Sequence, residues 1–516
     1  MIHLGAVRLL TVGGMVAAIA CGCTQVSGLN GLTFGPGDGG GGNLTTGPGG
    51  GSGGTGGSEG PQGGGGTREP SGECGVSLEA RHAWSTAFRS AGEVRVTHIV
   101  PLSEGRSLLV VRQEGAISLP TGDVPARSNA HLLVLLDAQG HIDRVTQLST
   151  QRDDDKDSDD GGVFTITAAG ANSSNRIFIA GKLAGDLALD GGEGADSGSA
   201  SANSYLLEVK AGGGFGVLGY FTDTTQLDIH DLAVRGDQIW AVGSTTNVNG
   251  MTVGRINTYR VQDSINYEAH ADLAVARSTV ARVELFDDGD LLVSGPTDSR
   301  FALVDDPNAV DVERANATTS VFVARVRPPE SSLATAVQWA RVLGSNDRLA
   351  ATADVAADES DGVVVAGHFS GVAFLGDETQ VLAMPDPDLF AVRLQANSGN
   401  TIDQLLFPST GGETLSDFVV EDDVYAVGAF DGDLDFGMTV LNQPNTTPFI
   451  AQLGIEGDLC LALDLPGAAL TESRLALSPA DRVLLGGGFQ GTFSAGGPAL
   501  TSLNFEANGF VAAFAR

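Results

Sequence analysis

The residues best placed for chemistry in this 516-residue chain are the carboxylates of an acidic run in its first third. Asp155, Asp157 and Asp159 alternate along that run, and alternate carboxylates in a loop can converge on Ca²⁺, a cation that prefers oxygen ligands. The sixth position of such a loop would be Asp160 in place of glycine, and the twelfth would be Ile166 in place of glutamate. These departures remove the turn and the bidentate ligand. A solvated loop is therefore favoured over a Ca²⁺ site.

Other patterns with catalytic or metal-binding spacing are missing from the sequence. The eight histidines are scattered, with no His-x-His and no His-Glu-x-x-His, which argues against a zinc site. His368 stands within an apolar segment and is interpreted as a packed or hydrogen-bonded residue. The ranges 35–40 and 50–54 match a dinucleotide motif and a nucleophile elbow, but neither has a strand–turn–helix context. We therefore assign no catalytic residue and no cofactor beyond the weak Ca²⁺ site.

The chain contains four cysteines, which fall into two groups. Cys21 and Cys23 stand near the N-terminus, Cys74 opens the part expected to fold, and Cys460 lies in an expected edge strand. A Cys74–Cys460 disulfide would pin the start of the fold in an oxidising compartment. Two unpaired thiols are the alternative, because connectivity cannot be deduced from a sequence alone.

These residues are positioned by a repeated ten-residue phrase. It stands as Gly362–Gly371 and returns as Asp423–Gly432 and Arg482–Gly491, with four fainter copies upstream. An apolar run of β-formers closed by glycine predicts a strand buried on both faces, with the glycine releasing the chain into a bend. Seven copies in one chain indicate a repeat architecture.

Each copy reads as the second strand of a four-strand unit that recurs about every 50 to 70 residues. The chain ends on a third strand, Gly509–Phe514, with no fourth strand after it. Trp84–Ser90 echoes a fourth strand, Trp339–Ser345, and stands before the first unit. An N-terminal strand that completes the last unit would close a ring without an exposed seam. The predicted fold is all-β: a seven-bladed β-propeller of four-stranded blades, closed by an N-terminal outer strand.

The repeated phrases V-x-G-x-F-x-G, D-x-F-V-A-R-L and W-A-R-x-L-G resemble bacterial seven-bladed β-propeller (SBBP-type) repeats, which secreted proteins and lipoproteins often carry. The resemblance covers roughly residues 82–516, and the first and third units match poorly. It implies the fold and says almost nothing about activity, since the matching residues are strand-core and turn positions. The best matches are Gly367, Phe369, Gly371, Phe390, Arg393, Asp435, Phe436 and Gly437.

The N-terminus is expected to be a signal peptide, residues 1–20. Its apolar run, Leu9–Ala20, is too short to span a bilayer but suits the central region of a signal peptide. The run ends at Cys21 in a context that resembles a bacterial lipoprotein signal, which implies a lipid on Cys21. Residue 22 is not Asp, so retention in the inner membrane is not implied and an outer-membrane anchor is expected. Simple secretion after ordinary signal-peptidase cleavage is the alternative.

A lipidated, glycine-rich linker is expected over residues 21–73, and the propeller domain over residues 74–516. Glycine, serine, threonine and proline dominate the linker, so it buries nothing and behaves as a flexible coil. Such a linker would let a periplasmic or cell-surface domain reach outward from its lipid anchor.

Composition limits the partners. The chain carries 29 basic and 63 acidic residues, a formal net charge of −34. A protein with this much negative charge repels nucleic-acid backbones and anionic lipid surfaces. Neither is therefore expected as a partner. A monomer is expected.

Function is predicted only in outline. A lipid-anchored, extracytoplasmic propeller that binds or scaffolds protein or glycan at the cell envelope is the favoured hypothesis, supported by fold alone. A propeller hydrolase or lyase acting on polysaccharide or peptide is the alternative, and convergent carboxylates on the channel rim would favour it. An envelope protein with no dedicated ligand is the third. Long insertions between second and third strands, at 191–203, 305–319 and 377–388, are expected to form the binding face.

Overall fold

A computed structural model describes the chain from residue 81 to residue 516 with gaps. The predicted signal peptide, the linker, Cys21, Cys74 and the acidic run lie outside the described residues, so these predictions stay untested. No helix in the described part of the chain is long and apolar enough to cross a membrane. The residues left out are 1–80, 128, 151–162, 185, 190–194, 197–202, 210–216, 224–226, 247–248, 274–276, 299, 303–311, 314–316, 330–335, 356–361, 377–379, 383–385, 438, 455–458 and 504–505.

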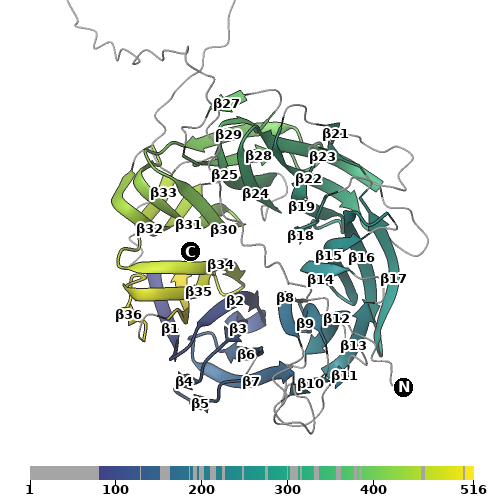
Figure 1. The fold of residues 1–516 in the computed structure, drawn as a ribbon, viewed down its shortest axis with the longest axis vertical. Coiled ribbons are helices and arrows are strands. Elements are labelled where there is room, and N and C mark those ends of the chain that lie inside the picture. Colours follow the sequence, from purple (N-terminus) through teal and green to yellow (C-terminus); the bar gives the residue numbers. More distant parts are fainter. Residues whose placement is uncertain are drawn as a thin grey trace, which may run out of the picture. The chain divides into compact units, whose positions relative to one another are not determined.

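The described chain is built from strands, with one short 3₁₀ turn, η1 (Ser103–Gly105). The innermost strands lie around the centre of the ring (Figure 1), where cavities form a central channel. They are β2 (Val94–Pro101), β8 (Phe164–Ala171), β14 (Asp228–Arg235), β18 (Arg282–Leu285), β24 (Arg348–Val355), β30 (Glu413–Val420) and β34 (Ala468–Ser478). Second strands are β3 (Ser107–Gln113), β9 (Ile177–Leu183), β15 (Gln238–Thr246), β19 (Leu291–Thr297), β25 (Val363–Ser370), β31 (Asp423–Asp435) and β35 (Arg482–Phe493).

Third and outer strands complete each sheet. Third strands are β6 (Ala130–Leu136), β12 (Asn203–Val209), β16 (Thr252–Val261), β22 (Thr319–Arg327), β28 (Asp388–Leu394), β32 (Val440–Gly454) and β37 (Asn508–Ala515). Outer strands are β7 (Ile142–Thr150), β13 (Val217–Asp223), β17 (Ile265–Asp272), β23 (Ala336–Ser345), β29 (Thr401–Phe407), β33 (Leu459–Asp464) and β1 (His82–Ser90). Within each sheet the four strands pair in this order, which makes the fold an all-β propeller.

The prediction of uniformly four-stranded blades is wrong. Among the described residues, four sheets have four strands, two have six, one has seven, and a further pair, β20 (Arg300–Phe301) and β21 (Val312–Glu313), stands apart. The additional strands are three short hairpins, and the short strand β36 (Leu500–Thr501) pairs with β35. The hairpins are β4 (Ile117–Leu119) with β5 (Gly122–Val124), β10 (Asp186–Leu189) with β11 (Ala195–Asp196), and β26 (Val372–Phe374) with β27 (Gln380–Leu382).

Each hairpin leaves its own sheet after the second strand and adds to the outer strand of the preceding one. Thus β4 pairs with β1, β10 pairs with β7, and β26 pairs with β23. An outer strand presents unpaired backbone groups, and a hairpin from the next sheet satisfies part of that edge. Segments expected to be open binding loops are thus used, in part, to join neighbouring sheets.

The N-terminal strand joins the sheet formed by the end of the chain. β1 pairs antiparallel with β37, with Trp84 opposite Ala513 and Ala87 opposite Phe510. The resulting order is β34-β35-β37-β1, so the last sheet receives its outer strand from the first described segment. Separation of either end from the other would expose two strand edges, which makes closure a cooperative feature of the fold.

The glycine that ends the apolar run of the repeated phrase does not bend the chain, although the sequence predicted that it would. It lets two neighbouring strands approach closely. β25 continues through Gly367 to Ser370, so the glycine lies inside the strand. A Cβ atom on Gly367 would lie 2.0 Å from the carbonyl oxygen of Ala350 in β24. The corresponding distances are 1.8 Å at Gly181 and 2.2 Å at Gly428. Only a residue without a side chain lets the innermost strand approach so closely.

A β-bulge in the innermost strand lies beside this close approach. The pairing register shifts between Ile166 and Ala168, between Ile229 and Asp231, and equivalently in β2, β30 and β34. A bulge inserts one extra residue and re-aims the side chains around it. The extra residues include Thr167 in β8 and His230 in β14, and both line the channel. The repeated glycine and the channel lining are therefore parts of one local geometry.

Phenylalanines fill the space around the second and third strands. Phe369 of β25 meets Phe390 of β28 edge-on, with ring centroids 5.9 Å apart. The equivalent pair in the last sheet, Phe489 and Phe510, has centroids 5.8 Å apart at 87°. Edge-to-face rings gain quadrupole attraction as well as buried area. The Phe positions of the two repeated phrases are therefore core positions.

Replacement of the close-approach glycine should be far more damaging than replacement of a nearby strand glycine. Gly181→Ala places a methyl group against the carbonyl oxygen of Thr165 and should lower the free energy of unfolding by about 2–4 kcal/mol. Gly170→Ala in the same sheet meets its nearest atom, a methyl group of Val234, at 3.3 Å, where a side chain has to shift only slightly, and should change it by less than about 1 kcal/mol. Urea denaturation of both variants checks this, and equal effects would contradict it.

Candidate functional site

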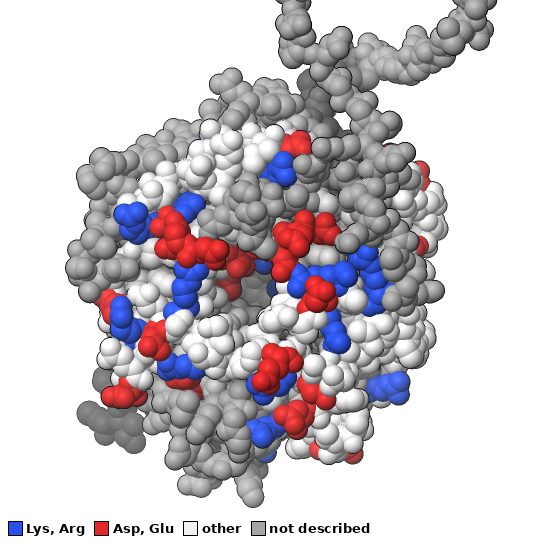
Figure 2. All heavy atoms as spheres, turned by 180° about the vertical axis from the view of Figure 1, so that it is seen from behind, with Lys and Arg blue, Asp and Glu red and all other residues white. Residues whose placement is uncertain are grey.

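Two adjoining cavities occupy the channel in the described part of the chain, and Figure 2 shows the hollow from one face. The larger, of about 530 Å³, is lined by histidines and is called the histidine chamber. The smaller, of about 340 Å³, contains Asp231, Arg282, Glu284 and Asp417 and is called the carboxylate chamber. Both chambers share the same boundary residues, which join them: Thr97, His98, Thr167, His230, Ala281 and Arg474.

The histidine chamber presents imidazoles that are neutral at pH 7. Burial lowers the pKa of His98 to about 4, and the nearby Arg474 lowers it further against a backbone hydrogen bond with Thr167. Burial, His98 and Arg112 together lower the pKa of His131 to about 3. A neutral imidazole has one donor and one acceptor nitrogen. His98 Nδ1 lies 3.1 Å from Thr97 Oγ1, whereas His131 Nδ1 is buried without a hydrogen-bond partner.

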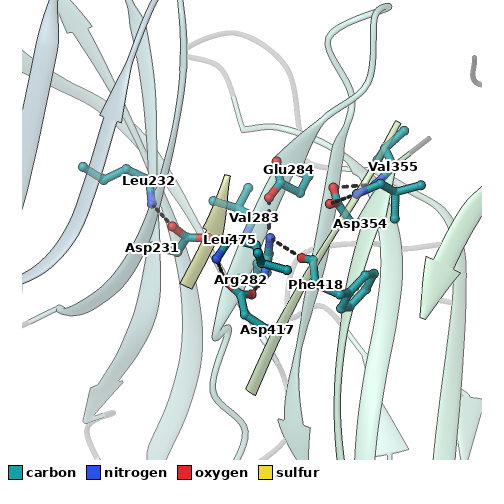
Figure 3. Close-up of polar contacts among 11 residues, drawn as sticks. Asp231, Leu232, Arg282, Val283, Glu284, Asp354, Val355, Asp417, Phe418 and Leu475 are labelled. Atoms are coloured by element: carbon teal, nitrogen blue, oxygen red, sulfur yellow. Dashed lines mark hydrogen bonds and ion pairs between the residues drawn. The ribbon is translucent and has the colours of Figure 1, made fainter. Parts of the chain in front are cut away.

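The carboxylate chamber is organised by one guanidinium (Figure 3). Arg282 of β18 donates from Nη1 to Asp417 Oδ1 at 2.9 Å and from Nε to Glu284 Oε1 at 3.2 Å. Asp417 belongs to β30, two innermost strands along from β18, so the first of these ion pairs joins two sheets that are not consecutive. The third nitrogen, Nη2, donates to the Phe418 carbonyl oxygen at 3.5 Å, so all three nitrogens of the guanidinium are used.

Carboxylates of the innermost strands also accept backbone N–H groups from the next innermost strand. Asp231 Oδ2 accepts from Val283 N at 2.9 Å. Asp354 Oδ2 accepts from Val420 N at 3.0 Å, and Asp417 Oδ2 accepts from Leu475 N at 2.9 Å. Each bond therefore joins two neighbouring sheets at the channel wall, and it is stronger when the accepting carboxyl group is ionised.

Burial sets the charge of this wall. It raises the pKa of Asp231 to about 7, and the Glu284 carboxylate raises it further, against Arg282 and two backbone N–H groups. Burial and Glu284 likewise raise the pKa of Asp354 to about 7. Burial alone would lower the pKa of Arg282, but the surrounding acids, Asp417 first, hold it well above its usual value. Near pH 7 Asp231 and Asp354 are therefore each partly protonated. The channel wall then carries fewer negative charges than its number of acidic residues suggests.

Acidic side chains do converge on the carboxylate chamber, as the enzymatic hypothesis required. The oxygens of most of them, however, already accept hydrogen bonds from the protein. Both oxygens of Asp231 accept backbone N–H groups, and those of Asp417 accept Arg282 and Leu475. Glu284 bonds only to Arg282 among the described residues. No three His, Cys, Asp or Glu side chains in the described part of the chain are arranged to hold a metal ion.

Some of the residues singled out from the sequence can be placed. His368 Nδ1 accepts from Leu415 N at 3.3 Å, which confirms the hydrogen-bonded role predicted for it. Cys460 lies in β33 and is disulfide-bonded, while the other three cysteines lie outside the described residues. Pairing with Cys74 therefore stays a prediction. Arg81 donates to Gln452 Oε1 at 2.6 Å, and Gln452 faces Leu461, the neighbour of Cys460.

Sequence reasoning missed the acids of the channel wall. Asp231, Asp354 and Asp417 all stand in innermost strands, each just before an apolar residue that continues the strand. A carboxylate repeated at the same place in several units is a usable signal. Its purpose could not be deduced, however, because the partner N–H belongs to another unit, 52 to 66 residues downstream.

Comparisons with known proteins add little. No protein-family model matches the chain, and no curated protein matches its sequence. Quinohemoprotein alcohol dehydrogenase from Comamonas testosteroni is 11% identical over 84% of this chain and 76% of its own, with a TM-score of 0.37. The extracellular domain of BT4673 from B. thetaiotaomicron is 9% identical over 84% of this chain and 82% of its own, with a TM-score of 0.20. Likenesses this weak carry no argument about activity, and the SBBP-type resemblance stays a prediction.

Removal of the guanidinium should destabilise the ring. Arg282→Met leaves the buried Asp417 and the half-buried Glu284 without a cation and should lower the free energy of unfolding at pH 8 by about 3–5 kcal/mol. Arg112→Met is the matched control, because Arg112 and its partner Glu114 are about half exposed, 49% and 47%. Exposed pairs contribute at most about 1 kcal/mol. Urea denaturation at pH 8 compares the two, and equal losses would rule out the structural role of Arg282.

The neutral His98 should contribute to acid sensitivity. Its folded pKa of about 4 lies below the unfolded value of 6.5, so its stabilisation is present above pH 6.5 and is lost as the pH falls toward 4. Between pH 7 and pH 5 the loss is about 2 kcal/mol. His98→Gln should remove that part of the pH dependence. The raised pKa values of Asp231 and Asp354 act in the opposite direction, so the difference between wild type and variant isolates the imidazole.

The measurement is the free energy of unfolding of wild type and His98→Gln at both pH values. His141→Gln, an exposed histidine outside the channel, controls for the substitution itself. Parallel pH profiles for wild type and His98→Gln would show that His98 is not held neutral.

Proposed function

We propose that the protein is a ligand-binding β-propeller that takes an uncharged, hydroxyl-rich ligand, such as a short glycan, in the histidine chamber. The observation that carries this proposal is the lining of hydroxyls and neutral imidazoles around a cavity of about 530 Å³. Ligand cavities of about 300–1,000 Å³ are typical for small molecules. Neutral imidazoles and threonine hydroxyls each both donate and accept, as sugar hydroxyls do.

The charged residues of the chamber also support a neutral ligand. Arg112 pairs with Glu114 at 2.8 Å, and Glu472 pairs with Arg95. The lining holds two arginines, Arg112 and Arg474, and two glutamates, Glu114 and Glu472, so its formal charges balance and the cavity has no strong preference for an anion or a cation. Binding would then depend on hydrogen bonds, and buried polar groups that a wrong ligand leaves unpaired give such sites their selectivity.

The cellular setting remains part of the proposal. A lipid on Cys21 and the glycine-rich linker would hold the propeller at the outer membrane, facing the periplasm or the cell surface, where glycans are abundant. This address rests on the sequence alone, since residues 1–80 lie outside the described part of the chain.

A hydrolase or lyase is the second candidate, and one observation favours it. Burial raises the pKa of Glu284 in the carboxylate chamber, and a carboxyl group with a raised pKa is what glycoside cleavage needs as a proton donor. The neighbouring acids are held by backbone N–H groups, so binding is preferred over catalysis.

The test is calorimetry of the full-length protein with a panel of neutral mono-, di- and trisaccharides. His230→Ala should weaken the binding of a recognised saccharide at least about tenfold without lowering Tm, because His230 is exposed to the channel and bonds only weakly, to Ser244 Oγ at 3.4 Å. His141→Ala, outside the channel, should bind like wild type.

Absence of saccharide binding at millimolar concentrations, or equal affinity in His230→Ala and wild type, would overturn the binding proposal. Release of cleaved products that stops in Glu284→Gln would establish the enzymatic alternative in its place.

A further inference from the structure

Arg474 of β34 is a channel residue to which the proposed function assigns no contact. It lines both chambers and belongs to the boundary that joins them. The residue is exposed. A ligand that passes from one chamber into the other therefore passes beside its guanidinium.

The fold makes little use of this guanidinium. Within the described part of the chain its one hydrogen bond runs from Nη1 to the carbonyl oxygen of Ser473, its own neighbour, at 3.5 Å. That distance is long for a hydrogen bond. Glu472, the closest acid in the sequence, forms its ion pair with Arg95 instead. Most of the five N–H donors of Arg474 therefore have no acceptor in the protein.

The same position serves the fold in other sheets. Arg474 directly follows the bulge of β34 and pairs with Gly486. Asp417 directly follows the bulge of β30, and Asp231 directly follows that of β14. Both carboxyl groups accept a backbone N–H of the next innermost strand. Since Arg474 donates only to its own neighbour among the described residues, it does not join sheets as those two acids do.

The surrounding acids decide which group Arg474 can bind. Glu472 lines the histidine chamber, and Asp231, Glu284 and Asp417 line the carboxylate chamber. These carboxylates would repel an anionic group on the ligand, whereas neutral hydroxyl oxygens accept hydrogen bonds without that repulsion. A planar guanidinium donates two parallel N–H bonds at once. Two hydroxyl oxygens on adjacent carbons of a sugar can accept them.

Hydroxyl side chains continue on both sides of this guanidinium. Thr97 and Thr167 lie at the boundary, and Ser294, Thr352 and Ser416 line the carboxylate chamber. Thr352 Oγ1 is buried, and no group in the described residues bonds to it. A buried hydroxyl without a partner is costly, and a ligand hydroxyl would supply one. The polar lining that suits a sugar therefore extends beyond the histidine chamber.

We propose that the ligand is an oligosaccharide that crosses from the histidine chamber into the carboxylate chamber, with Arg474 binding two neighbouring hydroxyl oxygens at the crossing. This inference rests on the proposed function, because it takes a neutral glycan as the ligand and specifies its length and the residue that selects it. Arg474 is then a specificity-determining residue. A monosaccharide occupies one chamber and leaves the hydroxyl groups of the other without a partner.

Calorimetry of the full-length protein at pH 8 tests this with neutral mono-, di- and trisaccharides of glucose, galactose and mannose. For the sugar that binds, wild type should bind the trisaccharide at least about tenfold more tightly than the monosaccharide, because the longer ligand bonds in both chambers. Arg474→Met should weaken trisaccharide binding at least about tenfold, since bonds from a charged donor are lost. Its Tm should stay unchanged, because the guanidinium makes one long bond with the protein.

Two further variants separate the guanidinium from its charge and from the substitution itself. Arg474→Lys keeps the charge but not the planar fork, and should bind the trisaccharide at least about fivefold more weakly than wild type. It also carries the test if the methionine variant does not fold. Arg260→Met is the matched control, because Arg260 lies in the third strand β16 with a side chain 42% exposed, and it should bind like wild type.

The outcomes distinguish this inference from the proposed function. If no saccharide binds to wild type, the proposed function fails and the inference fails with it. If a saccharide binds but the trisaccharide has no advantage over the monosaccharide, or if either Arg474 variant keeps wild-type affinity, only the inference is overturned.

Discussion

The structure depends on bonds in which a carboxylate of one innermost strand accepts a backbone N–H of the next. The three bonds from Val283, Val420 and Leu475 are 2.9 to 3.0 Å long and lie at the wall of the channel. Each sheet of a propeller contacts its neighbours mainly through apolar side chains, which fix distance but not register. A directional hydrogen bond to a carboxyl oxygen fixes register as well. Arg282 adds a longer link, since it joins β18 to Asp417 of β30.

A second constraint, the close approach of innermost and second strands, makes these bonds geometrically available. The repeated glycine lets a carbonyl oxygen of the innermost strand lie where a Cβ would stand. The bulge beside it turns side chains such as Thr167 and His230 into the channel. The same local geometry therefore builds the channel wall and supplies the polar lining of the proposed binding chamber. Stability and binding share residues in this protein, and this explains why the acids of the channel are better understood as structural groups than as catalytic ones.

Much of the fold could be predicted from local sequence, and what could not depends on contacts between units. Apolar runs such as Val363–Ser370 identified the second strands, and the unpaired third strand at the C-terminus identified β1 as its partner. The hairpins that extend neighbouring outer strands were missed, because short polar segments carry no sign of which edge they join. Arg474 was missed because a single arginine in a polar stretch gives no sign that it lines a channel. The glycine was recognised but misinterpreted, since only the partner strand reveals the close approach.

Amide hydrogen exchange at Val283, Val420 and Leu475 tests the central claim most directly. If the carboxylate bonds hold the ring together, these three amides should exchange only through global unfolding, with protection equal to the slowest amides of the core. Exchange at the rate of ordinary edge-strand amides would show that these bonds open locally and do not hold the ring together.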